Sequence, residues 1–214
     1  VSLRSDLMRA IYNLSPSFVR FSAGEIDASS AIENIGSWKK TVGPLETRKQ
    51  SFTHVNKNVF SVMEEVWASD KERIDLVIFL NGLAIMTFEL KCNLAGQSFE
   101  DAIYQYRTER NPKTRLFLFK AGCLVNFAMD LNEVYMTTKL DGQSTFFLPF
   151  NMGNGEGVNS GKGNPTFEDR YSVSYMWEDI LKKDTVLYLI DKIIFLQKET
   201  KKNPDTGKRE TKET

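Results

Sequence analysis

The sequence contains very little cysteine and histidine. Among its 214 residues there are two cysteines and one histidine. Two cysteines are too few for a disulfide framework, and a single histidine excludes a histidine-rich zinc site. Charge of neither sign is in excess, because Lys plus Arg and Asp plus Glu both number 28. This balance excludes a uniformly basic coat for nucleic acid, so any DNA-binding face must be local.

Long hydrophobic runs are absent as well. No stretch approaches the roughly 18 uninterrupted apolar residues of a membrane span, and the opening VSLRSDLMRA lacks the apolar core of a signal peptide. We therefore expect a soluble, cytoplasmic protein without a membrane partner. The 41% of hydrophobic residues is enough for one substantial core, and the length is near the upper size for a single domain.

The composition changes near the end of the chain. Beyond Gln197 the sequence is rich in Lys, Glu and Thr and almost without apolar side chains, which is typical of a disordered or linking segment. We expect one domain over residues 1–197 and a charged linker over residues 198–214. Because the first residue is Val rather than Met, we also expect a fragment whose N-terminal part is truncated.

Hydrophobic periodicity predicts an α/β fold with a mixed central sheet flanked by helices. The capping-box pattern of Ser98 and Asp101 begins one helix, which we expect to end near Arg110. This helix should cross over into a strand at residues 115–119, parallel to the strand at 83–91. The other predicted elements are helices at 3–14, 28–40, 174–183 and 184–198 (the last capped by Asp184), strands at 52–67, 73–80, 123–130 and 133–138, a hairpin at Asp141-Gly142 and a mobile loop at 151–165.

The stretch RIDLVIFLNGLAIMTFELK, residues 73–91, predicts a hairpin around its Asn-Gly pair. A two-residue turn would place Asp75 and Glu89 on different faces of the sheet. A three-residue loop would instead place both carboxylates on one face with Lys91. Burial favours the three-residue loop, because only this register gathers the apolar side chains on the opposite face: Ile74, Leu76, Ile78, Leu80, Met86, Phe88 and Leu90.

Two carboxylates on one face of a strand pair repel each other unless a cation lies between them. The oxygens of Asp75 and Glu89 suit Mg²⁺, which takes few protein ligands and keeps waters for a phosphate substrate. Lys91 could then steady a phosphate oxygen or the attacking hydroxide. The pattern therefore predicts a phosphodiester-hydrolysing site, against the alternative of half-solvated charges at strand ends.

A basic patch follows at the end of the predicted helix, formed by Arg107, Arg110 and Lys113. In a nuclease these side chains would contact DNA phosphates. The alternative is a solvated helix terminus, where the helix dipole favours positive charge.

Asp75, a following apolar strand and the tripeptide ELK at Glu89–Lys91 resemble the core motif of the PD-(D/E)xK nuclease superfamily. Two longer stretches, IDLVIFLNGLAIMTFELK and AIYQYRTERNPKTRLFLFKAGCLVNFAMDLNEVYMTTKLDGQSTFFLPFNMGNG, resemble the restriction (R) subunit of type I restriction-modification enzymes. The likeness extends from about Phe52 to Gln197.

This resemblance implies a restriction-endonuclease-like core that cuts double-stranded DNA with Mg²⁺. It implies that Asp75 and Glu89 are metal ligands and that Lys91 is the catalytic lysine. Gln105 matches the glutamine that the family carries on the helix after the Glu-x-Lys strand. The family often has Tyr four residues later, where this sequence has Glu109.

The resemblance also implies partners: the methylation and specificity subunits of a restriction complex, and an ATP-driven motor further along the chain. The sequence itself holds no G-x-x-x-x-G-K-[ST] motif, because Gly163 follows the lysine of GVNSGKGN where Ser or Thr should ligate magnesium. ATP would therefore act only through the absent motor. Two alternatives stay open: a non-catalytic module that clamps DNA or docks a subunit, and another PD-(D/E)xK nuclease.

Overall fold

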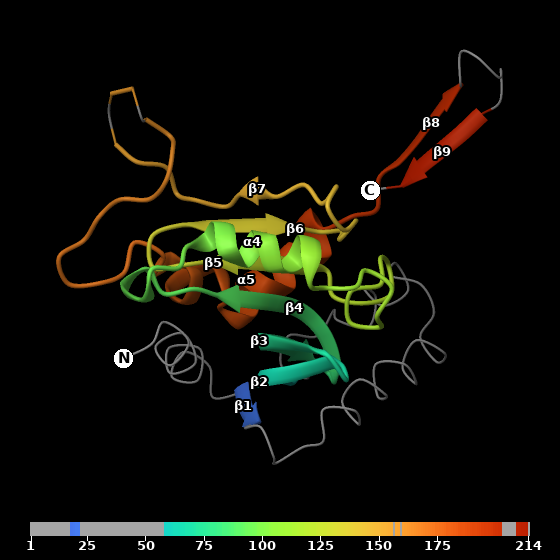
Figure 1. Cartoon of the computed structure of the whole chain (residues 1–214), viewed down its shortest axis with the longest axis horizontal. Coiled ribbons are helices and arrows are strands. Elements are labelled where there is room, and N and C mark those ends of the chain that lie inside the picture. Colours follow the sequence, from blue (N-terminus) through green and yellow to red (C-terminus); the bar gives the residue numbers. More distant parts are fainter. Residues whose placement is uncertain (1–17, 22–57, 156, 159, 203–208, 214) are drawn as a thin grey trace.

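A mixed β-sheet with helical segments on both faces forms the body of the protein (Figure 1). The computed structural model describes residues 18–21, 58–155, 157–158, 160–202 and 209–213. The predicted helices at 3–14 and 28–40 lie outside these residues. Within them, the expected α/β class is confirmed.

The sheet has seven strands, and their spatial order follows the order of the chain. Strand β1 runs parallel to β2 and β4 runs parallel to β5, whereas the other neighbours are antiparallel. The strands are β1 (Phe18–Phe21), β2 (Phe60–Ser69), β3 (Glu72–Leu80), β4 (Leu83–Leu90), β5 (Val125–Met129), β6 (Val134–Thr137) and β7 (Leu148–Pro149).

The crossover between β4 and β5 contains helix α4 (Phe99–Thr108). Its start is confirmed, since the Ser98 side chain and the Asp101 carboxylate form a reciprocal capping box. The strand expected at residues 115–119 is wrong, because this segment forms turns and β5 takes the parallel place beside β4. Leu116 is buried, but its carbonyl accepts the N–H of Cys123, which folds the segment back on itself.

The two faces of the sheet carry separate hydrophobic clusters. Helix α4 covers one face through Ala102 and Tyr106. The other face is covered by three short C-terminal helical segments, which Figure 1 shows behind the sheet: η3 (Met176–Ile180), α5 (Lys183–Tyr188) and η4 (Leu189–Ile193). A short 3₁₀ turn, η2 (Asn93–Ala95), joins β4 to α4.

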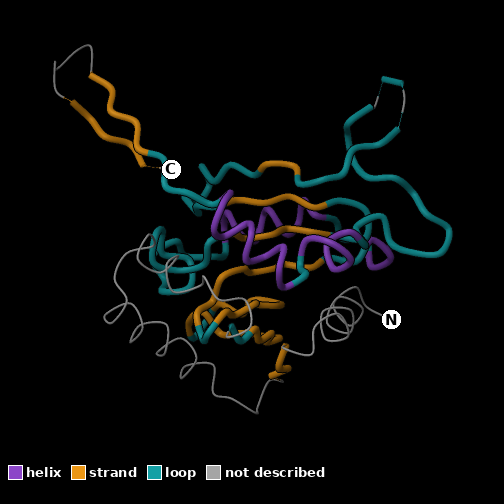
Figure 2. Tube along the Cα trace, turned by 180° about the vertical axis from the view of Figure 1, so that it is seen from behind, coloured by secondary structure: helices purple, strands orange, loops and turns teal. Residues whose placement is uncertain are grey.

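The end of the chain differs from the sequence-based expectation in two ways. Asp184 lies in the first turn of α5 rather than capping it, and the N-cap position is Lys182 without a side-chain cap. Where a disordered or linking segment was expected, β8 (Lys198–Lys202) and β9 (Arg209–Glu213) pair as an antiparallel hairpin that projects from the body (Figures 1 and 2). Gly142 lies in a turn with a φ of 55°, but the hairpin predicted at Asp141-Gly142 is wrong, because the antiparallel strands β6 and β7 are joined by the longer segment 138–147. The described residues within the predicted loop at 151–165 belong to no named helix or strand.

The tight fold-back before β5 generates a stability prediction. A Cβ added at Gly122 would lie 2.2 Å from the carbonyl oxygen of Leu116, whereas one at Gly155 would meet nothing within 4 Å. We expect Gly122→Ala to lower the free energy of unfolding by about 1–3 kcal/mol, because backbone must shift to relieve the overlap. Gly155→Ala is the matched control and should change it by less than about 0.5 kcal/mol. Denaturant titrations of both variants measure this, and equal stabilities would contradict the prediction.

Candidate active site

The hairpin of β3 and β4 turns through two residues, so the predicted three-residue loop is wrong. Leu80 pairs with Leu83, and Asn81 and Gly82 form the turn with φ values of 53° and 79°. Positive φ at both positions is what a two-residue hairpin turn demands, and Asn-Gly is the pair that best tolerates it. With an undisturbed ladder, this turn would have separated Asp75 from Glu89.

A β-bulge in β4 restores the expected common face. Phe79 pairs with Ala84, but its neighbour Ile78 pairs with Met86, so Ile85 is an extra residue on β4. Beyond the bulge Leu76 pairs with Phe88.

The next residues along the two strands are Asp75 and Glu89, which therefore lie side by side on the α4 face. The bulge also buries Ile85 and Met86 together on the opposite face, in one hydrophobic cluster. The bulged register therefore does two things at once: it buries Ile85 and Met86, and it places the carboxylates of Asp75 and Glu89 on one face. Of the predicted apolar set, Ile74 alone lies in the cluster on the α4 side.

The two carboxylates differ in their surroundings. Asp75 is half-buried, and its Oδ2 accepts the backbone N–H of Leu90 at 2.8 Å. Glu89 is almost fully enclosed, with 1% of its surface exposed. Its partner is Arg110, whose Nε and Nη2 lie 2.8 and 2.7 Å from Oε1 of Glu89.

Burial is the main cause that raises the pKa of Glu89, from 4.5 to about 7. Repulsion by Asp75 adds to it, while the contacts with Arg110 and the charge of Lys91 oppose it. The ion pair therefore does not fully offset the loss of water and the neighbouring negative charge. Such a pair of crowded carboxylates favours an additional cation.

Lys91 continues β4 beyond Glu89 and is 9% exposed. Its backbone N–H donates to the carbonyl of Met129 on β5, which fixes the strand end that carries it. The structure thus brings together Asp75, Glu89 and Lys91, as the sequence pattern predicted.

Gln105 and the basic patch are placed by α4 and the turns after it. Gln105 is half-buried, and its Oε1 is enclosed without a hydrogen-bond partner among the described residues. The Nε of Arg107 donates to the carbonyl of Thr145 at 3.0 Å, and Lys113 is exposed. The alternative of a solvated helix terminus does not hold for Arg110, because this residue is 8% exposed and forms an ion pair with Glu89.

Two features of the site were not predicted from the sequence. One is the role of Arg110, although its spacing of four residues from Tyr106 and eight from Ala102 continues the buried stripe of α4. The other is a buried polar chain under the site, in which the hydroxyl of Thr87 contacts Tyr106 and donates to Asn126. Burial, and next the charge of Glu89, raises the pKa of Tyr106 well above its usual value, so its phenol stays neutral.

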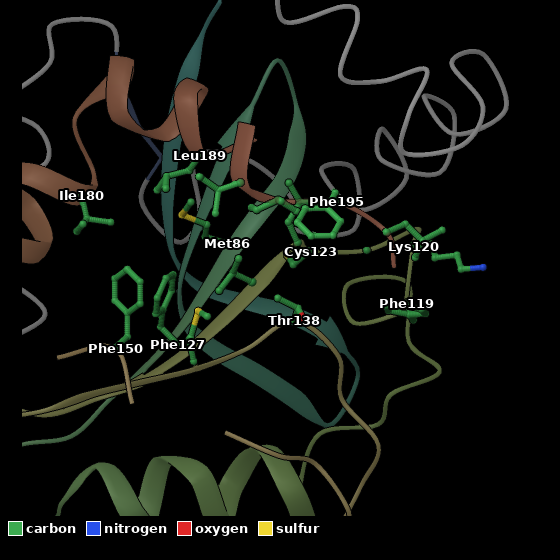
Figure 3. A pocket seen from close by; sticks show the side chains of 17 residues that line it. Met86, Phe119, Lys120, Cys123, Phe127, Thr138, Phe150, Ile180, Leu189 and Phe195 are labelled. Carbon is green, nitrogen blue, oxygen red and sulfur yellow. The ribbon is translucent and has the colours of Figure 1, made fainter. Parts of the chain in front are cut away.

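A cavity of about 220 Å³ lies on the opposite face of the sheet, between the strands and η4 (Figure 3). Met86, Phe127 and Leu189 are among the side chains that meet there, and the lining is almost wholly apolar. A phosphate or a metal ion needs charged or oxygen ligands. This cavity therefore does not supply the chemistry that the carboxylate pair offers.

The described residues contain neither a cluster of metal-ligating side chains nor a membrane-spanning helix. No group of three or more His, Cys, Asp or Glu side chains there could hold a metal ion. No helix in the described part of the chain is long and apolar enough to cross a membrane. Any cation at Asp75 and Glu89 would thus have those two carboxylates as its acidic ligands from the described residues.

Comparison with known protein families identifies a family to which this chain is similar. The family model described as the type I restriction enzyme R protein N terminus matches residues 4–145, which is more than half of the chain and includes β3, β4 and α4. No curated protein sequence matches the chain.

The raised pKa of Glu89 generates a pH prediction for the metal-free protein. Between about pH 4.5 and 7 the folded state binds a proton at Glu89 that the unfolded chain has lost, so stability contributed by this group falls as pH rises. Relative to Glu89→Gln, the wild type should lose about 3 kcal/mol of unfolding free energy across this range. Urea titrations with a chelator at several pH values measure the difference. A gap between the two proteins that is constant with pH would contradict the assignment.

Proposed function

Because the chain belongs to the family of type I restriction enzyme R protein N termini, we propose that it is the endonuclease domain of such a subunit. In this proposal it hydrolyses phosphodiester bonds of double-stranded DNA with Mg²⁺. The observation that carries the proposal is the bulged register of β3 and β4, which brings Asp75 and Glu89 side by side, with Lys91 two residues beyond Glu89 at the end of β4. A structural hairpin has no need for three ionisable side chains on the covered face of a sheet.

The donor set fits Mg²⁺. This ion is bound by one or two carboxylates plus substrate phosphate and keeps several waters, and two carboxylates are what β3 and β4 provide. Their mutual repulsion, which contributes to the raised pKa of Glu89, is the electrostatic reason for a cation to bind there. When bound, Mg²⁺ would supply a Lewis acid that lowers the pKa of a water and offsets charge on the phosphate.

The chain's own residues would do the remaining work. Lys91 would place a positive charge beside the attacked phosphate and stabilise the charge that develops on its oxygens. Gln105, whose side-chain oxygen has no partner among the described residues, would help to orient the site or the DNA. We propose DNA contacts for Arg107 and Lys113, since Arg110 is enclosed against Glu89.

The partners in this proposal are double-stranded DNA and the methylation and specificity subunits of a restriction complex. ATP would be used only by a motor carried elsewhere in the same subunit. The formal net charge of zero agrees with a domain that is brought to DNA by its partners rather than by its own surface.

A non-catalytic module that clamps DNA or docks a subunit is the second candidate. The observation that favours it is the pair of Arg110 and Glu89, because an arginine already provides Glu89 with a positive partner. The two functions differ in whether a divalent ion binds at the carboxylates, and the two experiments that follow separate them.

Cleavage by the assembled restriction complex tests the catalytic role. Glu89→Gln and Lys91→Ala in the R subunit should each lower DNA cleavage by at least about 100-fold, because each removes charge that stabilises the transition state. ATP hydrolysis by the same complexes should stay unchanged. Lys71→Ala, in the exposed turn between β2 and β3, is the matched control and should cut normally. Normal cleavage by both site variants would refute the nuclease assignment.

Direct observation of an ion tests the cofactor. Crystals of the chain soaked in Mn²⁺ should show an anomalous density peak between the carboxylates of Asp75 and Glu89, because Mn²⁺ accepts the same oxygen ligands as Mg²⁺. Crystals of Glu89→Gln, treated in the same way, should lose the peak. A wild-type structure without the peak at saturating Mn²⁺ would support the non-catalytic candidate.

A further inference from the structure

Arg110 joins three elements of the structure at the edge of the proposed site. It follows α4, and its Nη1 lies 3.8 Å from the carboxylate of Glu109 at the end of that helix. Its Nη2 donates to the backbone carbonyl of Arg73 on β3 at 3.2 Å. The same guanidinium holds Glu89 on β4. A backbone carbonyl is a fixed acceptor, so the position of this guanidinium is set by β3 as well as by Glu89.

The guanidinium holds Glu89 by one oxygen. The contacts from Nε and Nη2 both converge on Oε1. The usual fork of arginine and carboxylate places one nitrogen on each oxygen and so engages the whole carboxylate. In this structure both nitrogens contact the same oxygen of the Glu89 carboxylate.

The contact of Arg110 with Oε1 of Glu89 opposes the repulsion between the two carboxylates. Asp75 and Glu89 share a face and repel each other, which would turn the longer Glu89 side chain away from its neighbour. Arg110 is tied to Arg73, two residues before Asp75 on β3, and so holds Glu89 toward the strand that carries Asp75. Attraction to Arg110 thus keeps together two groups that would otherwise separate.

Resting on the proposed nuclease function, we propose that Arg110 is a positioning residue for the metal ligand Glu89. It holds Glu89 through Oε1, keeps the carboxylate beside Asp75 and leaves the second oxygen for the divalent ion. Partners of this kind, which orient a ligand without touching the metal, commonly contribute about 10- to 100-fold to metal affinity.

Two other roles of Arg110 predict different effects on metal binding. If the arginine were a stand-in for the cation, the metal would have to displace it, and removing Arg110 would strengthen metal binding. If it served stability alone, a folded variant would bind metal as the wild type does. Metal affinity therefore separates the three roles, and cleavage activity is not needed as a readout.

The experiment is a Mn²⁺ titration of the chain, followed by the electron paramagnetic resonance signal of free Mn²⁺. Arg110→Met should weaken binding by about tenfold or more. Because an unpaired buried Glu89 will destabilise that variant, Arg110→Lys is the second variant. Lysine restores one charge but not the planar fork that reaches Oε1 and the Arg73 carbonyl together, so its affinity should fall between the other two. Thermal unfolding confirms that each protein tested is folded.

Arg170→Lys is the matched control, because it alters an exposed Arg–Glu ion pair, with Glu178, away from the site. It should bind Mn²⁺ like the wild type. Unchanged or tighter binding by folded Arg110→Lys, with wild-type binding abolished by Glu89→Gln, would overturn the role of Arg110 alone. Wild-type chain that binds no Mn²⁺ through Glu89 would overturn the proposed function, and this inference with it.

Discussion

The closeness of two carboxylates on the covered face of the sheet is the constraint from which the rest of the site follows. Asp75 and Glu89 come from adjacent strands, and Glu89 has almost no access to water. Charge in such a place must be met by hydrogen bonds or by opposite charge. The backbone N–H of Leu90 donates a hydrogen bond to Asp75, and the guanidinium of Arg110 donates to Glu89. Burial, and next the charge of Asp75, raise the pKa of Glu89 in spite of these partners, and such a crowded pair of carboxylates favours the binding of a cation.

The bulge at Ile85 links this constraint to the hydrophobic core. A regular ladder from the two-residue turn would put one carboxylate on each face and mix charged with apolar side chains throughout. One extra residue in β4 shifts the pairing, so that Leu76 meets Phe88 and the apolar side chains gather toward the C-terminal helices. Core packing and site assembly thus depend on the same single residue, and the core supplies the free energy that holds the charged groups together.

Period-two alternation in β3 and β4 was enough to predict that Asp75 and Glu89 share a face, although it placed Ile74 on the wrong side of the sheet. The Ser98 capping box was enough to place the start of α4. The origin of the shared face was not predictable, because a three-residue loop and a two-residue turn with a bulge each shift the pairing by one residue. The two shifts run in opposite directions, yet both place the carboxylates on one face. The apolar run at 115–119 resembles a strand, but the close approach of Gly122 to Leu116 decides that it turns back. The role of Arg110 depends on tertiary contacts with β3 and β4, which lie far away in sequence.

The position of Arg110 makes the site depend on how α4 packs. The residue follows the helix, while the carboxylate and the carbonyl that it contacts belong to β4 and β3. Tyr106, one helical turn earlier, is buried against the same face and contacts the hydroxyl of Thr87, two residues before Glu89 on β4. These two contacts fix both the helix and its end relative to the Glu-x-Lys strand. A displacement of α4 would therefore move the partner of Glu89, together with Gln105 and Arg107 on the same helix, so the helix and the carboxylates form one mechanical unit.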